Sequence, residues 1–167
     1  MSKIGILVAS ASNNRKLGDK LKELATIENV EAEVINLVDL DLPLYSTVEE
    51  ERNGIPDTAK ELANKILSLK AFIIVAPEYN GVMPPVLNNA MAWTSRATES
   101  WRDAFNEKIV GLATHSGGGG NDVMQAMRTQ FTRLGAIVLP REIVTTFQKK
   151  LDENSSERIL KQFLQLL

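Results

Sequence analysis

Residues 71–81 read AFIIVAPEYNG, an apolar run of six residues that leads directly into a proline, a carboxylate, an aromatic ring, an amide and a glycine. A short, continuously apolar run is typical of a strand that is covered on both faces, as in a parallel sheet. Two other stretches repeat this arrangement: KIGILVA at 3–9 leads into SASNN, and KIVGLAT at 108–114 leads into HSGGGG. The sequence therefore predicts three central strands, each followed by a loop of unusual composition.

Helical patterns separate these strands. Leucines at helical spacing follow the first strand, and Pro56 and Pro84-Pro85 stand where proline favours the first turn of a helix. A fourth helical pattern spans 122–134, and Ser155 is the expected N-cap of a last helix. Together these patterns predict helices between all the central strands.

Two shorter strands are expected at 30–37 and 136–139. The β–α order, repeated about five times, predicts an α/β protein with right-handed crossovers. The expected architecture is a flavodoxin-like three-layer sandwich with a five-stranded parallel sheet in the order 2-1-3-4-5. A Rossmann half-fold is the alternative, although the glycines of its fingerprint are missing.

The composition narrows the possible functions. A length of 167 residues predicts one domain, residues 1–167. The absence of cysteine excludes thiolate nucleophiles and cysteine metal sites, and a single histidine excludes a His-rich metal site. The net charge of −2, without a basic stripe, argues against nucleic-acid binding. No apolar run approaches the roughly 20 residues of a membrane span, and no signal-peptide pattern is present, so a cytoplasmic protein is expected.

The first loop joins a strand to the N-terminus of a helix, where free N–H groups and the helix dipole favour an anion. Its residues Ser10, Ser12, Asn13 and Asn14 add hydroxyl and amide donors without formal charge, which suits a phosphate carried by a larger ligand. Simple N-capping by Ser12 or Asn13 is the alternative interpretation.

The second and third loops also suit a ligand. The second, Pro77 to Gly81, could place main-chain donors and acceptors along the edge of a flat heteroaromatic ring, although it could also be a simple turn. The four glycines at 117–120 would let the backbone approach a ligand closely, or would form only a flexible connection. His115 is expected to be a hydrogen-bonded structural residue.

One feature of the sequence points to an assembly. The helix at 84–96 is apolar on more than one face, which predicts burial against a second subunit. Trp93 within it, and Trp101 beyond it, could each lie in the core, in a dimer interface or in a pocket wall. The irregular segment 38–57 is long enough to be functional or mobile.

At these loops the sequence resembles the NADPH-dependent FMN reductase family, whose members include chromate and quinone reductases and azoreductases of flavodoxin-like fold. The strongest match is PEYN at 77–80, followed by Pro84, Leu87, Asn89-Ala90 and Trp93 at the family's spacing. Ser12 and Asn14 to Leu17 resemble the family's phosphate loop, and Ser116-Gly117-Gly118 is a third match. The resemblance spans nearly the whole chain.

The resemblance implies an FMN-dependent oxidoreductase that uses NADPH or NADH. Hydride would pass from the nicotinamide to FMN and then to a quinone, an azo compound, a metal oxyanion or free flavin. Neither a catalytic side chain nor a metal ion is implied. A homodimer or homotetramer is implied, with the flavin covered partly by segment 38–57 and partly by a neighbouring subunit. The implied FMN-binding residues are Ser10, Ser12, Asn13, Asn14, Pro77, Glu78, Tyr79, Asn80, Ser116, Gly117, Gly118 and Gly119.

The chain departs from the family pattern in its first loop, which is shorter and lacks an arginine between the serines, although Arg15 and Lys16 follow. Two alternatives therefore stay open. One is a flavodoxin-like electron carrier, which would not oxidise NAD(P)H itself. The other is a family member that has lost its flavin activity and acts through assembly or regulation.

Overall fold

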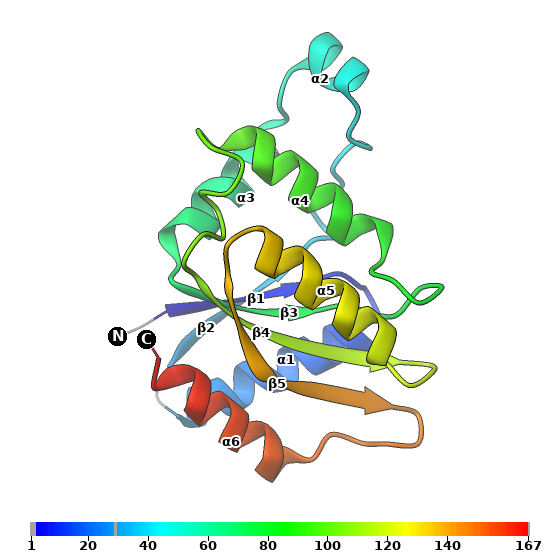
Figure 1. Ribbon diagram of the computed structural model, residues 1–167, viewed down its shortest axis with the longest axis vertical. Coiled ribbons are helices and arrows are strands. Elements are labelled where there is room, and N and C mark those ends of the chain that lie inside the picture. The colour runs from blue at the N-terminus through cyan, green and yellow to red at the C-terminus, as the bar shows by residue number, and fades with distance from the viewer. Residues whose placement is uncertain (1–2, 29, 167) are drawn as a thin grey trace.

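A parallel sheet forms the centre of the protein in the computed structural model, which describes residues 3–28 and 30–166 (Figure 1). Within these residues the sheet has five strands in the order β2-β1-β3-β4-β5, and every neighbouring pair is parallel. The predicted flavodoxin-like sheet order is therefore confirmed. The strands are β1 (Lys3–Val8), β2 (Glu31–Asn36), β3 (Ala71–Val75), β4 (Ile109–Ser116) and β5 (Ile137–Thr146).

Helices cover both faces of the sheet (Figure 1). One face carries α1 (Asn13–Ile27) and α6 (Glu153–Leu164), and the other carries α3 (Asp57–Ser68), α4 (Pro85–Ala97) and α5 (Asn121–Arg133). The short α2 (Thr47–Asn53) stands away from the body of the protein (Figure 1). The three layers follow from right-handed crossovers between parallel strands.

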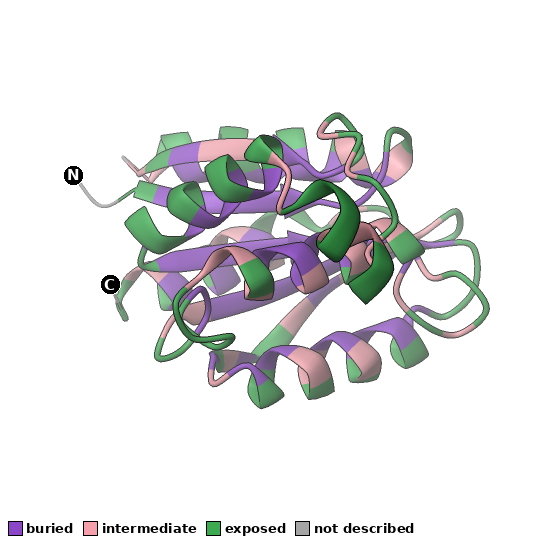
Figure 2. Cartoon of the chain, turned by 90° about the horizontal axis from the view of Figure 1, so that it is seen from above, coloured by how far each residue is buried: buried purple, intermediate pink, exposed green. Residues whose placement is uncertain are grey.

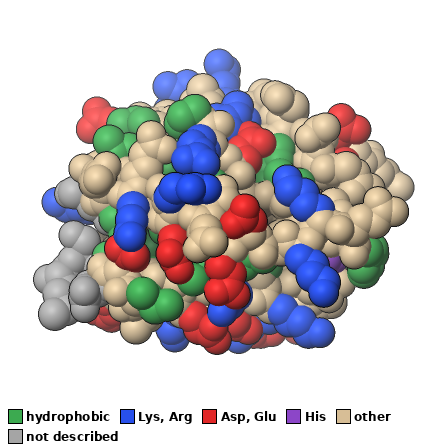
Figure 3. Space-filling model, turned by 90° about the horizontal axis from the view of Figure 1, so that it is seen from below, with side chains coloured by type: hydrophobic (Ala, Val, Ile, Leu, Met, Phe, Trp, Pro, Cys, Tyr) green, Lys and Arg blue, Asp and Glu red, His purple; other side chains and the backbone are tan. Residues whose placement is uncertain are grey.

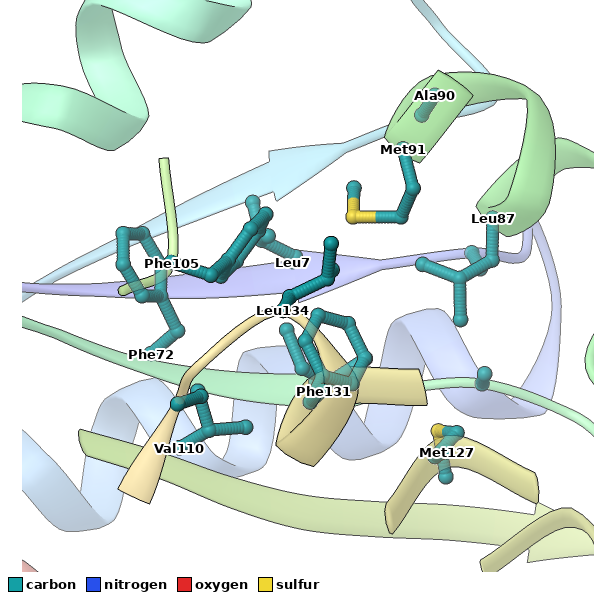
Figure 4. Packing of buried hydrophobic residues seen from close by; sticks show 14 of the residues in the cluster. Leu7, Phe72, Leu87, Ala90, Met91, Phe105, Val110, Met127, Phe131 and Leu134 are labelled. Carbon is teal, nitrogen blue, oxygen red and sulfur yellow. The ribbon is translucent and has the colours of Figure 1, made fainter. Parts of the chain in front are cut away.

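The alternation of side chains along each strand divides the core in two. Ile6 and Val8 pack with α1 and α6, whereas Leu7 between them packs with α3, α4 and α5. Figure 2 shows the buried central strands between the helices. Figure 4 shows the cluster that contains Leu7. In it the Phe105 ring lies between those of Phe72 and Phe131, with centroid distances of 5.5 and 5.2 Å. Burial on both faces explains why these strands read as continuous apolar runs.

Close packing of α1 fixes the start of that helix over the sheet. A Cβ atom on Gly18 would lie 2.6 Å from Cγ2 of Val8, so only a glycine allows α1 to approach β1 this closely. The N-terminus of α1 is thereby held at the end of β1, next to the first of the three loops.

The structure corrects three predicted elements. Strand β5 is ten residues long rather than ending at Leu139, because a register shift opposite Val110 and Leu112 lets pairing resume at Glu142. Such a bulge, with Pro140 inside it, is tolerated at a sheet edge. The N-cap of α6 is Asp152, whose carboxylate accepts from the N–H of Ser155 at 2.9 Å, and not Ser155 itself.

The third correction is α2, which lies inside the segment expected to be irregular. Ser46 caps this helix by accepting from the N–H of Glu49 at 3.0 Å. The sequence S-x-x-E at this position is a helix start signal that the apolar pattern does not reveal, because the helix buries none of its residues. Across residues 3–28 and 30–166, none of the helices has both the length and the hydropathy needed to cross a bilayer.

Candidate functional site

The loops that follow β1, β3 and β4 leave the sheet at the same edge, where the carboxyl ends of the three adjacent strands meet (Figure 1). In open α/β sheets this edge, near the change in strand order, is where ligands bind. The three sequence-predicted loops are therefore neighbours in space, and specific hydrogen bonds join them.

Asn14 joins the first loop to the end of β4. Its side chain is 2% exposed, and Nδ2 donates to the carbonyl of His115 at 2.8 Å while Oδ1 accepts from the N–H of His115 at 2.7 Å. The amide thus pairs with a backbone peptide as a neighbouring strand would. Asn14 was predicted to bind phosphate, and the structure gives its side chain this bond to His115, while its backbone N–H lies in the first turn of α1.

The start of α1 offers donors to an anion. Ser12 occupies the N-cap position, but its side chain makes no hydrogen bond to the N–H groups of the helix. Simple capping by the Ser12 side chain, the alternative interpretation, is therefore wrong. Ser10 Oγ accepts from the N–H of Ser12 at 3.1 Å and lies 3.3 Å from Ser12 Oγ. The N–H groups of Asn13 and Asn14 lie in the first turn, where a helix provides no carbonyl partner. These groups and the helix dipole suit a phosphate.

Glu78 joins the second loop to the third. Its carboxylate accepts from the hydroxyl of Ser116 at 2.5 Å and from the N–H of Gly120 at 3.1 Å. Ser116 Oγ also accepts from the N–H of Gly118 at 2.9 Å, so the glycine loop folds around the Glu78–Ser116 pair. Glu78 and Ser116 were predicted to contact the cofactor, and the structure gives them a role in shaping the loops.

The second loop ends in a two-residue turn. The N–H and carbonyl groups of Tyr79 and Val82 pair at 2.9 and 3.1 Å, with Asn80 at φ 53° and Gly81 at φ 77° between them. Positive φ at both central positions is typical of a type I′ turn, for which Asn-Gly is a favoured pair. The turn presents Tyr79, 51% exposed, and the exposed Asn80 at the edge of the sheet, while Pro77 is buried behind them.

The glycine loop is exposed at 117–119 and anchored at Gly120. Gly120 has φ 77°, and a Cβ atom there would lie 3.0 Å from Cγ2 of Thr114 and 3.1 Å from Cγ1 of Val144. A side chain is therefore excluded at this position by both conformation and space. The three exposed glycines have no side chains, and the N–H of Gly118 is already bonded to Ser116 Oγ.

The chemistry of the two ends of this edge fits FMN. The α1 end has N–H groups and serine hydroxyls for a phosphate, without a carboxylate among the residues of the first loop. The Tyr79 end has an exposed aromatic ring and the bare backbone of 117–119 for a flat ring system. Arg15, which could have supplied charge, is instead paired with Asp19 at 3.3 Å and Asp39 at 3.4 Å.

His115 has the structural role expected of it. Its Nδ1 lies 3.1 Å from Oγ1 of Thr145, and its ring meets that of Phe147 edge-on with centroids 5.1 Å apart. The backbone of His115 receives the Asn14 side chain. The residue therefore connects the end of β4 to both α1 and β5.

Helix α4 has a function that the sequence interpretation missed. Residues 38–57 form an arm that includes α2, and three side chains of α4 hold it. Asn89 Oδ1 accepts from the N–H of Tyr45 at 2.8 Å, Trp93 Nε1 donates to the carbonyl of Pro43 at 2.7 Å, and Arg96 Nε donates to Glu50 at 3.0 Å. The N-A-x-x-W part of the motif thus anchors the arm.

This anchoring accounts for part of the apolar surface of α4. Trp93 is fully buried within one chain, with the Tyr45 ring packed edge-on against it at 5.1 Å, so the chain's own arm covers this part of α4. The arm runs beside α4, where Tyr45 bonds to Asn89 and Glu50 bonds to Arg96. Trp101 lies 47% exposed at the surface, with the Arg102 guanidinium 4.5 Å from its ring centroid.

The arm also carries a charged contact. The Arg96 guanidinium holds the pKa of Glu50 below its ordinary value, and burial together with the bond to Glu50 raises the pKa of the Tyr45 hydroxyl. Because the pKa of Glu50 is lowered in the folded state, this contact is lost as the pH falls through that pKa.

The comparison with known families agrees with the FMN chemistry that the three loops suggest. A family model described as NADPH-dependent FMN reductase matches residues 2–150. The chain belongs to this family. Its members are flavin-dependent oxidoreductases that use NADPH, which confirms the predicted family, cofactor class and reaction class.

Individual relatives share between 20% and 32% of their residues with this chain in the three comparisons that follow. An uncharacterized protein of Mycoplasma pneumoniae is 27% identical over 153 residues, which cover 88% of this chain and 89% of that protein. A quinone reductase of Escherichia coli is 32% identical over 123 residues, which cover 71% of this chain but only 64% of that enzyme. Among solved structures, the flavoenzyme NAD(P)H:(acceptor) oxidoreductase FerB of Paracoccus denitrificans has a TM-score of 0.81 at 20% identity, covering 99% of this chain and 96% of that one. The last likeness supports the fold.

Proposed function

We propose that this chain is an FMN-dependent NAD(P)H reductase that passes reducing equivalents to a quinone, with the FMN held along the carboxyl edge of β1, β3 and β4. One observation carries this proposal: the Asn14–His115 and Glu78–Ser116 bonds join the three predicted loops into a single binding edge. A quinone is chosen as acceptor because the Escherichia coli relative is named a quinone reductase.

Each loop has a proposed part in holding the cofactor. The N–H groups of Asn13 and Asn14 and the hydroxyls of Ser10 and Ser12 would hold the phosphate of FMN. Tyr79 and Asn80 would form one wall for the ring system, and the backbone at 117–119 would face its polar edge. Pro77, Glu78 and Ser116 would fix the shapes of these walls. Bound FMN supplies the hydride chemistry, so the protein provides binding, orientation and shielding from water.

We further propose that the protein works as a homo-oligomer in the cytoplasm, where NADPH is available. The arm supports an assembly, because Leu44 is 79% exposed, Val48 is 58% exposed and α2 has no buried residue. A helix of seven residues is unstable without packing, so a second subunit is the expected cover. A homodimer is the simplest such assembly, and light scattering distinguishes it from a monomer or a tetramer.

The reaction is tested on the protein reconstituted with FMN. Anaerobic NADPH should bleach the flavin absorbance, and added benzoquinone should restore it. Repeated turnover with both substrates should follow ping-pong kinetics. A yellow protein that NADPH does not bleach would be an electron carrier, and a colourless protein that takes up no FMN would have lost the activity.

A pair of variants tests the wall of the site. Tyr79→Ala removes an aromatic ring beside the proposed flavin, so we expect FMN to bind about tenfold more weakly, since stacking on an aromatic ring contributes roughly 1–3 kcal/mol. Trp101→Ala is the matched control, because it removes an aromatic ring of similar exposure far from the three loops. Equal FMN dissociation constants for the two variants would show that Tyr79 does not contact the ring.

A further inference from the structure

A cavity adjoins the end of the proposed flavin site where the phosphate would bind. It measures about 380 Å³ and lies between α1, the end of β5 and the residues before α6. Asn13 belongs to its lining and also to the first loop, so the cavity and the proposed phosphate site share a wall. Its volume lies within the range of small-molecule sites, roughly 300–1,000 Å³.

The cavity combines a cationic margin with an apolar interior. Lys16 and Lys20, one turn apart on α1, line it together with Lys150 from the other side. Leu17 and Leu151 supply apolar surface between them. No carboxylate belongs to the lining among residues 3–28 and 30–166. Three lysines without a lining carboxylate favour an anionic ligand.

The three lysines are not equally available. Lys20 is paired with Glu153 at 3.2 Å and with Glu23 at 3.3 Å. Lys16 and Lys150 take part in no ion pair within the described part of the chain. The unneutralised charge at the cavity is therefore about two units, which matches a phosphate monoester.

An aromatic wall completes the cavity. Phe147 lines it and is 74% exposed, so much of its ring is accessible to a ligand. His115 holds the ring by its edge-on contact. Figure 3 shows the only histidine, in purple, at one end of the molecule beside hydrophobic and Lys or Arg side chains. A flat aromatic group of a ligand could stack on the free face of Phe147.

We propose that this cavity binds the 2′-phosphorylated adenosine end of NADPH, with Phe147 stacking on the adenine and Lys16 and Lys150 pairing with the phosphate. The inference rests on the proposed function, since it assigns the co-substrate preference of that site. The shared wall at Asn13 places the cavity where a dinucleotide lying along the carboxyl edge would carry its adenosine end. The two free lysines select for the 2′-phosphate, which NADH lacks.

The test measures nucleotide binding to the FMN-loaded protein by calorimetry, with adenosine 2′,5′-bisphosphate as the probe and 5′-AMP as the comparison. The bisphosphate should bind more tightly than 5′-AMP. In the double variant Lys16→Gln/Lys150→Gln its affinity should fall about tenfold, because two exposed ion pairs of up to about 1 kcal/mol each are lost. Lys149→Gln is the matched control, since this neighbouring lysine does not line the cavity.

Steady-state kinetics link the cavity to the co-substrate. In the double variant the KM for NADPH should rise about tenfold while the KM for NADH and both kcat values stay unchanged. Equal binding of the bisphosphate to the wild-type protein and the double variant would overturn the proposal. Lysine-dependent binding with an unchanged KM for NADPH would also overturn it, because the cavity would then serve a free nucleotide. The calorimetric result stands even if the protein oxidises no NADPH, so failure of the proposed function is recognised separately.

Discussion

Replacing Asn14 by leucine should lower the free energy of unfolding by about 2–4 kcal/mol and abolish measurable FMN binding. The change keeps the approximate volume of the side chain but leaves the N–H and carbonyl of His115 without these partners in a partly buried position. Each such unsatisfied group costs roughly 1–3 kcal/mol. Loss of the Asn14–His115 hydrogen bonds also separates the first loop from the end of β4. The groups that would bind the phosphate are then no longer held in place.

Urea denaturation and FMN fluorescence titration measure the two effects. Asn14→Asp should be intermediate in stability, since it keeps an oxygen that accepts from His115 and loses only the donor. Asn53→Leu, at an exposed asparagine of α2, should change the stability by less than about 0.5 kcal/mol. If Asn14→Leu were as stable as Asn53→Leu and bound FMN normally, the Asn14–His115 hydrogen bonds would have no role in stability or in FMN binding.

Replacing Trp93 by alanine should cost about 3–5 kcal/mol, because it empties a fully buried site and removes the donor to the Pro43 carbonyl. The arm should detach from α4, so proteases should cut within 38–57 faster than in the wild-type protein. An oligomer that depends on the arm should dissociate at the same time, which light scattering would detect.

Trp93→Phe separates packing from hydrogen bonding at this position. It keeps an aromatic ring against Tyr45 but lacks the N–H, so a smaller loss of about 1 kcal/mol is expected. Trp101→Ala should leave stability nearly unchanged because that ring is half exposed. An arm that stayed resistant to proteases in Trp93→Ala would show that Asn89 and Arg96 hold it without the tryptophan.

The central strands and their order could be predicted because burial on both faces imposes a continuous apolar pattern on 3–9, 71–76 and 108–114. The full length of β5 could not be predicted, since its pairing crosses Pro140 through a bulge that depends on the partner strand. Helix α2 carries a cap signal but no apolar face, so periodicity does not detect it.

The predicted loops do meet at one edge, yet the roles of particular side chains could not be derived from the sequence. The partner of Asn14 is a backbone group 101 residues away, and the partner of Glu78 is a hydroxyl 38 residues away. Both side chains therefore shape the site, and whether they also contact a ligand stays a prediction. The lysine cavity could not be predicted from the sequence for the same reason, because only the fold brings Lys150 close to Lys16.

A crystal structure of the protein grown with excess FMN tests the central claim most directly. The account predicts the phosphate within hydrogen-bond distance of the N–H groups of Asn13 and Asn14, and the ring system between Tyr79 and the backbone at 117–119. An edge occupied only by solvent at saturating FMN, or FMN bound elsewhere on the protein, would contradict it.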